Sequence, residues 1–204
     1  MLSFGPSQRQ VTSGLGRFYE SARLPPNPMA THVPARPRTT ATRLSLVIGA
    51  ALAASGGVLI LVRLPYEAAV CTGVSAVLLL IGGHRSNHGA GDALDRMLDE
   101  LLDRLWDGAI LASIAWTVRG SDPHVAAAAL AALGASFLSS YVRARGASLG
   151  YTVEESHVTR GLRYALIVAG LGFGWLGWTV WATFGVSVLA VLVRTGQVAR
   201  EERA

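Results

Sequence analysis

Long apolar stretches are the feature that most limits how this chain can fold. Residues 44–62 contain no Asp, Glu, Lys or Arg, and a membrane-spanning helix needs about 20 mostly apolar residues. Five further apolar runs follow, at residues 68–83, 105–118, 125–142, 164–178 and 179–193. The helix of the 105–118 run is expected to begin earlier, near Ala93. The sequence therefore predicts an all-α, polytopic membrane protein whose six spans form a transmembrane helix bundle.

Charged residues are few, and the basic ones are all of one type. They make up 15% of the 204 residues, against roughly 25% in ordinary soluble domains. The net charge is +5, and all 18 basic residues are arginine. Because these arginines lie at the ends of apolar runs rather than in a soluble basic domain, we exclude nucleic acid as a partner. Membrane lipids with anionic head groups and phosphate-bearing substrates fit this distribution better.

The distribution of arginine also predicts the orientation in the membrane. If the N-terminus is cytoplasmic, every arginine except Arg63 and Arg119 falls on the cytoplasmic side of six spans. Positive residues concentrate on that side in membrane proteins. We therefore expect a multi-pass protein of the plasma membrane with both termini in the cytoplasm. The first 43 residues are polar and lack the apolar core of a cleavable signal peptide.

The chain divides into three segments by composition. Residues 1–43 are expected to be a cytoplasmic segment, residues 44–195 the membrane domain, and residues 196–204 a polar tail. Within the first segment, apolar side chains recur at helical spacing over residues 8–24, ahead of a linker at 32–43. This pattern predicts an N-terminal amphipathic surface helix, whose apolar face lies on the cytoplasmic leaflet or packs on the bundle.

An acidic stripe precedes the third apolar run. On a helix, five aspartates fall within about 120° of one another; they are Asp92, Asp95, Asp99, Asp103 and Asp107. Like charges at this spacing repel, and the repulsion grows near a bilayer. A positive partner is therefore expected. It is either a divalent metal, which carboxylate oxygens suit, or a set of arginines that includes Arg96, Arg104 and others on neighbouring helices.

Two histidines precede this stripe. His84 and His88 extend the same face if the helix is continuous through Gly89 and Gly91. Otherwise they are loop histidines at the membrane interface.

A basic cluster lies on the same side of the membrane as the aspartates. Arg143 and Arg145 close the fourth span, and Arg160 and Arg163 open the fifth. Arginine binds phosphate through its forked donors. The cluster is therefore either a pocket for a phosphorylated ligand or a set of anchors to lipid head groups.

Three stretches carry a family resemblance. They are residues 11–27, the pattern Leu98-Asp99-x3-Asp103-Arg104, and residues 141–163. The second stretch is similar to the second half of a signature, Asp-x2-Asp-Gly-x2-Ala-Arg-x8-Gly-x3-Asp-x3-Asp. With the spans between them, the resemblance covers roughly residues 8–195. The family that these stretches resemble is the CDP-alcohol phosphotransferases, and within it the actinobacterial phosphatidylinositol-phosphate synthase type.

The first half of that signature is missing. When the last two aspartates are aligned with Asp99 and Asp103, the first two positions fall on Leu78 and Ile81, and residues 72–84 contain no carboxylate. Asp92 and Asp95 have the spacing of the lost pair. They are candidate replacement ligands from the same helix as the second pair.

The resemblance implies a reaction and a set of roles. The protein would transfer a phosphatidyl group from CDP-diacylglycerol to a phosphorylated head-group alcohol, such as an inositol phosphate, and release CMP. Mg²⁺ or Mn²⁺ would be bound by Asp99 and Asp103, with Asp103 as the general base. The arginines Arg143, Arg145 and Arg160 would hold the phosphate of the head group. Because the family commonly forms dimers, a homodimer is expected.

Two alternatives remain open at this point. The half-retained signature also fits a catalytically inactive relative that binds lipid or pairs with a partner in the membrane. An unrelated small transporter is a third reading, although no inverted repeat is visible in the sequence.

Overall fold

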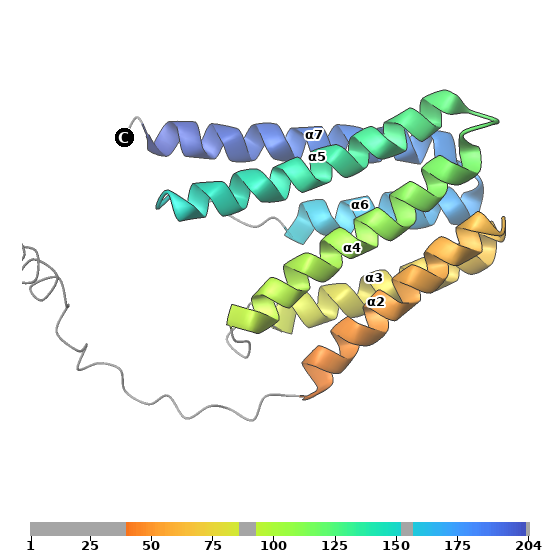
Figure 1. The fold of residues 1–204 in the computed structure, drawn as a ribbon, viewed down its shortest axis with the longest axis horizontal. Coiled ribbons are helices and arrows are strands. Elements are labelled where there is room, and N and C mark those ends of the chain that lie inside the picture. The colour runs from red at the N-terminus through yellow and green to blue at the C-terminus, as the bar shows by residue number, and fades with distance from the viewer. Residues whose placement is uncertain (1–39, 86–92, 152–156, 203–204) are drawn as a thin grey trace, which may run out of the picture. The chain divides into compact units, whose positions relative to one another are not determined.

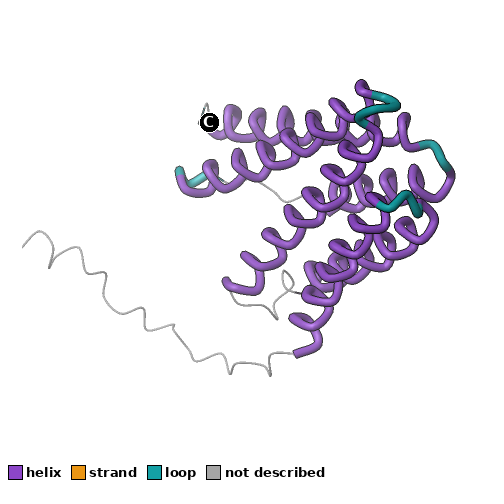
Figure 2. Tube along the Cα trace, turned by 45° about the vertical axis from the view of Figure 1, so that its right-hand side comes forward, coloured by secondary structure: helices purple, strands orange, loops and turns teal. Residues whose placement is uncertain are grey.

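The computed structural model describes residues 40–85, 93–151 and 157–202. These residues form six α-helices and no strand (Figure 1, Figure 2). In chain order the helices are α2 (Thr40–Leu61), α3 (Pro65–Arg85), α4 (Ala93–Val118), α5 (Pro123–Ser148), α6 (His157–Phe173) and α7 (Leu176–Glu201). The expected all-α architecture is confirmed. The expected surface helix at 8–24, as well as His88 and Asp92, lies outside the described residues.

The helices close a ring. Each helix packs against two others, in the cyclic order α2, α3, α6, α7, α5, α4, and α4 also touches α3. The short connections α2–α3, α4–α5 and α6–α7 lie at one end of the helices in Figure 1. The other end gathers the beginnings of α2, α4 and α6 with the ends of α3, α5 and α7. In this ring α4 and α6 are not packed neighbours, so only long side chains can join them across the interior.

Four of the described helices are long and apolar enough to cross a membrane. They are α2 from Arg43, α3, α5, and α7 to Arg200. The other two depart from this pattern because α4 carries the acidic stripe and α6 has only 17 residues. Large apolar side chains such as Val47, Val70 and Leu192 are exposed on the outside of the helices. In a bilayer such side chains face lipid rather than water.

Local signals set where the helices begin and end. The side chain of Asp122 accepts a hydrogen bond from the Val125 backbone N–H at 3.1 Å, and Pro123 follows at the first helical position of α5. Both are typical of helix N-termini. The apolar runs 164–178 and 179–193 place a turn near residue 178, but the turn before α7 lies at Gly174 and Trp175. Gly174 has φ +74°, a left-handed conformation that glycine adopts without strain.

Two helices run further than the apolar pattern predicts. The helix α7 continues to Glu201, into the segment expected to be a polar tail. The helix α5 continues to Ser148, so that Arg143 and Arg145 lie in its last turns. Arg160 and Arg163 lie in the first turns of α6. Helical structure thus extends through charged residues that the search for apolar runs cannot recognise.

The interior of the ring is closely packed. Trp106 and Ile110 of α4 and Tyr164 of α6 are buried, and the Trp106 and Tyr164 ring centroids lie 4.1 Å apart. Small residues let helices approach: a Cβ added at Gly170 of α6 would lie 1.9 Å from the Thr179 hydroxyl oxygen of α7. Close approach at small residues is typical of helices packed in membranes.

We expect Gly170→Ala to destabilise the protein, because the added methyl group must displace Thr179. Overpacking typically costs about 1–3 kcal/mol, which corresponds to a fall of several degrees in the thermal unfolding midpoint. Gly134→Ala is the matched control, since nothing lies within 4 Å of a Cβ at that helical position. Equal midpoints for the two variants in detergent would contradict this packing of α6 on α7.

Candidate functional site

The acidic stripe of α4 faces the interior of the bundle. The side chains of Asp95, Asp99, Asp103 and Asp107 are all buried, and Asp103 is only 1% exposed. They share one face of the helix, as their spacing predicts. Four buried carboxylates on one helix require compensation by positive charge.

Arginines on other helices meet the first two of these carboxylates. Arg43 of α2 donates from Nε to Asp95 at 2.8 Å. Arg160 of α6 donates from Nη1 to both oxygens of Asp99, at 2.9 and 3.1 Å. The Arg160 and Asp99 side chains are 6% and 3% exposed. A buried, charge-assisted pair of this kind is strong only because both partners are present.

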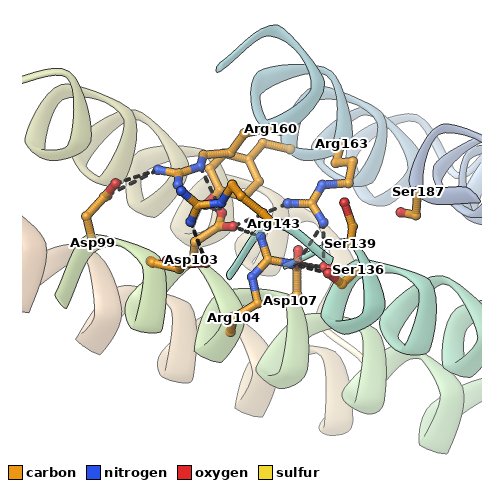
Figure 3. A network of polar contacts seen from close by, with 12 residues as sticks. Asp99, Asp103, Arg104, Asp107, Ser136, Ser139, Arg143, Arg160, Arg163 and Ser187 are labelled. Carbon is orange, nitrogen blue, oxygen red and sulfur yellow. Dashed lines mark hydrogen bonds and ion pairs between the residues drawn. The ribbon is translucent and has the colours of Figure 1, made fainter. Parts of the chain in front are cut away.

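The Asp103 carboxylate is surrounded by donors (Figure 3). Its Oδ1 accepts a hydrogen bond from the Tyr164 hydroxyl and lies 3.4 Å from Nε of Arg160. Its Oδ2 lies 3.4 Å from Nη2 of Arg163 and also contacts Arg104. Both oxygens of Asp103 are therefore committed to neighbouring side chains.

Asp107 completes the network one turn further along α4. Its Oδ2 accepts from Arg163 Nη1 at 2.8 Å and from Arg104 Nη1 at 3.1 Å. The Ser136 hydroxyl of α5 also donates to this oxygen. Together the four aspartates contact four arginines, which are Arg43, Arg104, Arg160 and Arg163. Arginine, one of the two positive partners that the sequence allows, thus contacts each of the four carboxylates. Arg96 is exposed.

A polar pocket adjoins this network between α4, α5, α6 and α7. Its cavity volume is about 20 Å³, and the wider space between the lining side chains, about 350 Å³, includes open solvent. The charged lining residues are Asp103, Arg104, Arg160, Arg163 and Arg194, and the hydroxyl-bearing ones are Ser136, Ser139, Thr159 and Ser187. The lining thus has four guanidinium groups and one carboxylate, although Arg160 and Arg163 are also paired with Asp99 and Asp107 outside the lining. This composition suits an anionic ligand with several oxygen acceptors.

Two buried donors of the pocket residues have no acceptor. The Nε atoms of Arg104 and Arg163 make no hydrogen bond to any described residue. A buried N–H without an acceptor is costly, and such groups in native proteins call for a specific reason. Both atoms belong to residues that line the pocket.

The structure divides the arginines that the sequence singles out. Arg160 lines the pocket. Arg143 pairs with Glu100, and Arg145 is exposed and lies within 3.5 Å of the Ser148 hydroxyl. Neither belongs to the pocket lining.

Sequence reasoning missed Arg194 as a site residue. Arg194 of α7 donates to the hydroxyl of Ser139 at 2.8 Å. Its position one heptad after Ser187, on one helix face, is a signal that could have been used. In the sequence Arg194 stands only as one of the arginines at the end of an apolar run.

The helix opposite Asp99 does not supply metal ligands. The first two signature positions fall on Leu78 and Ile81 of α3. Leu78 lies against α2, since a Cβ added at Gly49 would be 3.4 Å from the Leu78 Cβ, and Ile81 is 42% exposed. The residue of α3 that faces Asp99 is Gly83, where an added Cβ would lie 2.6 Å from the carboxylate oxygen. Residues 68–85 contain no carboxylate.

A divalent cation also meets unfavourable charge here. The four buried carboxylates are already matched by four guanidinium groups, so a divalent ion would have to displace arginine before it could coordinate them. Among the described residues, no three His, Cys, Asp or Glu side chains come together in a metal-binding arrangement. The donor set in the described part of the chain therefore does not fit a two-metal centre.

Removing Arg163 should destabilise the protein strongly, because it leaves the buried Asp107 and Asp103 undercompensated. Breaking one partner of a buried ion pair typically costs about 3–5 kcal/mol, so we expect the unfolding midpoint of Arg163→Gln to fall by roughly 10 °C. The double variant Arg163→Gln/Asp107→Asn should recover part of this loss. The exposed Arg145→Gln serves as the control. A shift for Arg163→Gln as small as that of the control would contradict the network.

The chain is similar in sequence to two curated proteins, although no protein-family model matches it. It is 34% identical over 137 residues to the phosphatidylinositol phosphate synthase of Corynebacterium glutamicum, which covers 62% of this chain and 63% of that protein. It is 30% identical over 131 residues to the same-named enzyme of Mycolicibacterium smegmatis, which covers 59% of each chain. The chain thus spans about 60% of the length of these relatives.

Solved structures share the fold. Phosphatidylinositol phosphate synthase (PgsA1) of Mycobacterium tuberculosis with CDP-DAG bound superposes with a TM-score of 0.67 and 19% identity, over 93% of this chain and 94% of that one. The same protein in complex with manganese and citrate gives a TM-score of 0.64 and 22% identity, over 78% and 80% of the two chains. In sequence the chain thus resembles the phosphatidylinositol phosphate synthases of two actinobacteria over about 60% of their length, and it shares its fold with a solved synthase of this kind.

Proposed function

We propose that the protein binds a phospholipid of the CDP-diacylglycerol class in the pocket between α4 and α7, as a relative that does not use the metal chemistry of the synthases. The observation that carries this proposal is the pair of buried Nε–H donors of Arg104 and Arg163, which have no acceptor among the described residues. They belong to a pocket with four arginines and a single carboxylate. A diphosphate offers several acceptor oxygens to such a set.

Arginine and hydroxyl groups from three helices would both donate hydrogen bonds to the phosphate oxygens. Arg194 and Ser139 come from α7 and α5, and they are hydrogen-bonded to each other at the edge of the pocket. Arg163 reaches from α6 to the same pocket. Phosphate oxygens held by donors from three helices would have a fixed orientation, whereas acyl chains would lie along the exposed apolar surfaces of the helices.

Asp103 has a different part in this proposal from the one the resemblance implies. Its carboxylate accepts from Tyr164 and lies against Arg160 and Arg163. A general base must be free to take a proton from a substrate hydroxyl at hydrogen-bond distance. The contacts of Asp103 support a structural role in which it holds the arginines of the pocket in place.

Transfer of the phosphatidyl group is the second candidate. In this reaction a head-group hydroxyl would attack the phosphorus attached to diacylglycerol, the bond to CMP would break, and Asp103 would accept the hydroxyl proton. Two observations favour it: the 34% identity to a phosphatidylinositol phosphate synthase, and the position of Asp103 in the pocket lining. The acceptor would be an anionic head-group alcohol such as an inositol phosphate.

The setting of either function is the plasma membrane, with both ends of the membrane domain on the cytoplasmic side. The arrangement of the helix ends supports this, because the α2, α4 and α6 starts lie at the same end as the α3, α5 and α7 termini. Most arginines lie toward that end. The homodimer expected from the resemblance remains a prediction.

Lipid binding can be measured with the purified chain in nanodiscs. We expect CDP-diacylglycerol to bind, and Arg194→Gln to weaken binding about tenfold or more, since a hydrogen bond to a charged group contributes about 1.5–3 kcal/mol. Arg145→Gln, outside the pocket, should bind as the unchanged protein does. CMP, phosphatidic acid and inorganic phosphate as competitors show which part of the lipid is recognised. Binding that is unaffected by Arg194→Gln would contradict this pocket.

The same preparation separates the two candidate functions. The binding proposal predicts no CMP release from CDP-diacylglycerol with Mg²⁺, Mn²⁺ or EDTA, across a panel of head-group acceptors and beside an active relative. Release that disappears in Asp103→Asn would establish the transferase instead.

A further inference from the structure

One guanidinium group spans the two carboxylates that the family signature would use for metal. Arg160 contacts both oxygens of Asp99 through Nη1, and its Nε lies 3.4 Å from Oδ1 of Asp103. Arg163 approaches the other oxygen of Asp103 at 3.4 Å. Two guanidinium groups of α6 thus contact the signature carboxylates Asp99 and Asp103 of α4.

The opposite side of the pair is closed. Gly83 of α3 packs so tightly on Asp99 that even a Cβ there would lie 2.6 Å from Oδ1 and 2.9 Å from Oδ2. The carboxylate therefore lies between the α3 backbone and the Arg160 guanidinium. A metal bridging α3 and α4 would need both space and oxygen donors on α3, and residues 68–85 supply no carboxylate.

We propose that the guanidinium groups of Arg160 and Arg163 replace divalent metal ions at the signature carboxylates, so that this site carries built-in cations and is independent of metal. The absence of carboxylates from residues 68–85 of α3 and the pairing of Asp99 and Asp103 with arginine then have a single explanation: guanidinium groups take the place of metal ions. Arg163 is shared between Asp107, at 2.8 Å, and Asp103, at 3.4 Å. The buried carboxylates are thus matched by guanidinium groups without a further cation.

The substitution has a consequence for the pocket. Arg160 and Arg163 also line it, so a phosphate ligand would meet arginine where a metal-dependent site would present an ion. This inference concerns the carboxylates alone. It can fail while lipid binding holds, and the reverse is also true.

Mn²⁺ binding to the whole chain in detergent tests the inference without any activity assay. The amplitude of the free Mn²⁺ EPR signal should not change when protein is added in excess, and the unfolding midpoint should be the same with Mn²⁺ and with EDTA. A loss of signal that Asp99→Asn abolishes would overturn the proposal. A loss that Asp103→Asn abolishes would overturn it as well, whereas a loss that persists in Asp99→Asn/Asp103→Asn arises at other carboxylates and agrees with it.

A thermodynamic cycle tests the pairing independently of metal. We expect Arg160→Gln to lower the unfolding midpoint by roughly 10 °C, and Arg160→Gln/Asp99→Asn to recover a large part of the loss, since both charges are then absent. Arg145→Gln, on α5, controls for the loss of an exposed arginine. If Arg160→Gln does not fold while the double variant does, the coupling is shown directly. Additive effects of the two changes would overturn the pairing.

Discussion

Four buried carboxylates on one face of α4 are the constraint on which the bundle depends. Each needs a positive partner, and the partners come from α2, α4 itself and α6. Because α4 and α6 are not packed neighbours in the ring, Arg160 and Arg163 cross the interior to reach them. Buried ion pairs add little net stability compared with apolar packing, but the loss of one partner is severe. The network therefore fixes how α6 lies relative to α4 more than it raises overall stability.

The same arginines connect this structural role to function. Arg104, Arg160 and Arg163 hold aspartates on one side and line the pocket on the other. Their positions are set before a ligand arrives, which lowers the entropy lost when a phosphate binds. Relatives of the chain are synthases, but here α3 opposes Asp99 with the backbone of Gly83. The fold is shared with a solved synthase, while residues 68–85 of α3 offer no carboxylate opposite Asp99.

Much of this architecture follows from the sequence, and the remainder depends on tertiary contacts. Apolar runs predict the helices, and the spacing of the aspartates predicts one acidic face with a positive partner. The choice between metal and arginine could not be made from spacing, because Arg43 and Arg163 lie far along the chain from the carboxylates they meet. The site role of Arg194 depends in the same way on how α7 packs on α5. The turn before α7 lies at Gly174, earlier than the apolar runs predict, because the apolar pattern continues across it.

A crystal structure of the protein grown with Mn²⁺ and CDP-diacylglycerol tests the central claim most directly, with data collected at the manganese absorption edge. The account predicts no anomalous peak within coordination distance of Asp99 or Asp103. It also predicts that Arg160 remains on Asp99 and that lipid phosphate lies against Arg163 and Arg194. A manganese peak bound by both aspartates, with Arg160 turned away from Asp99, would contradict it.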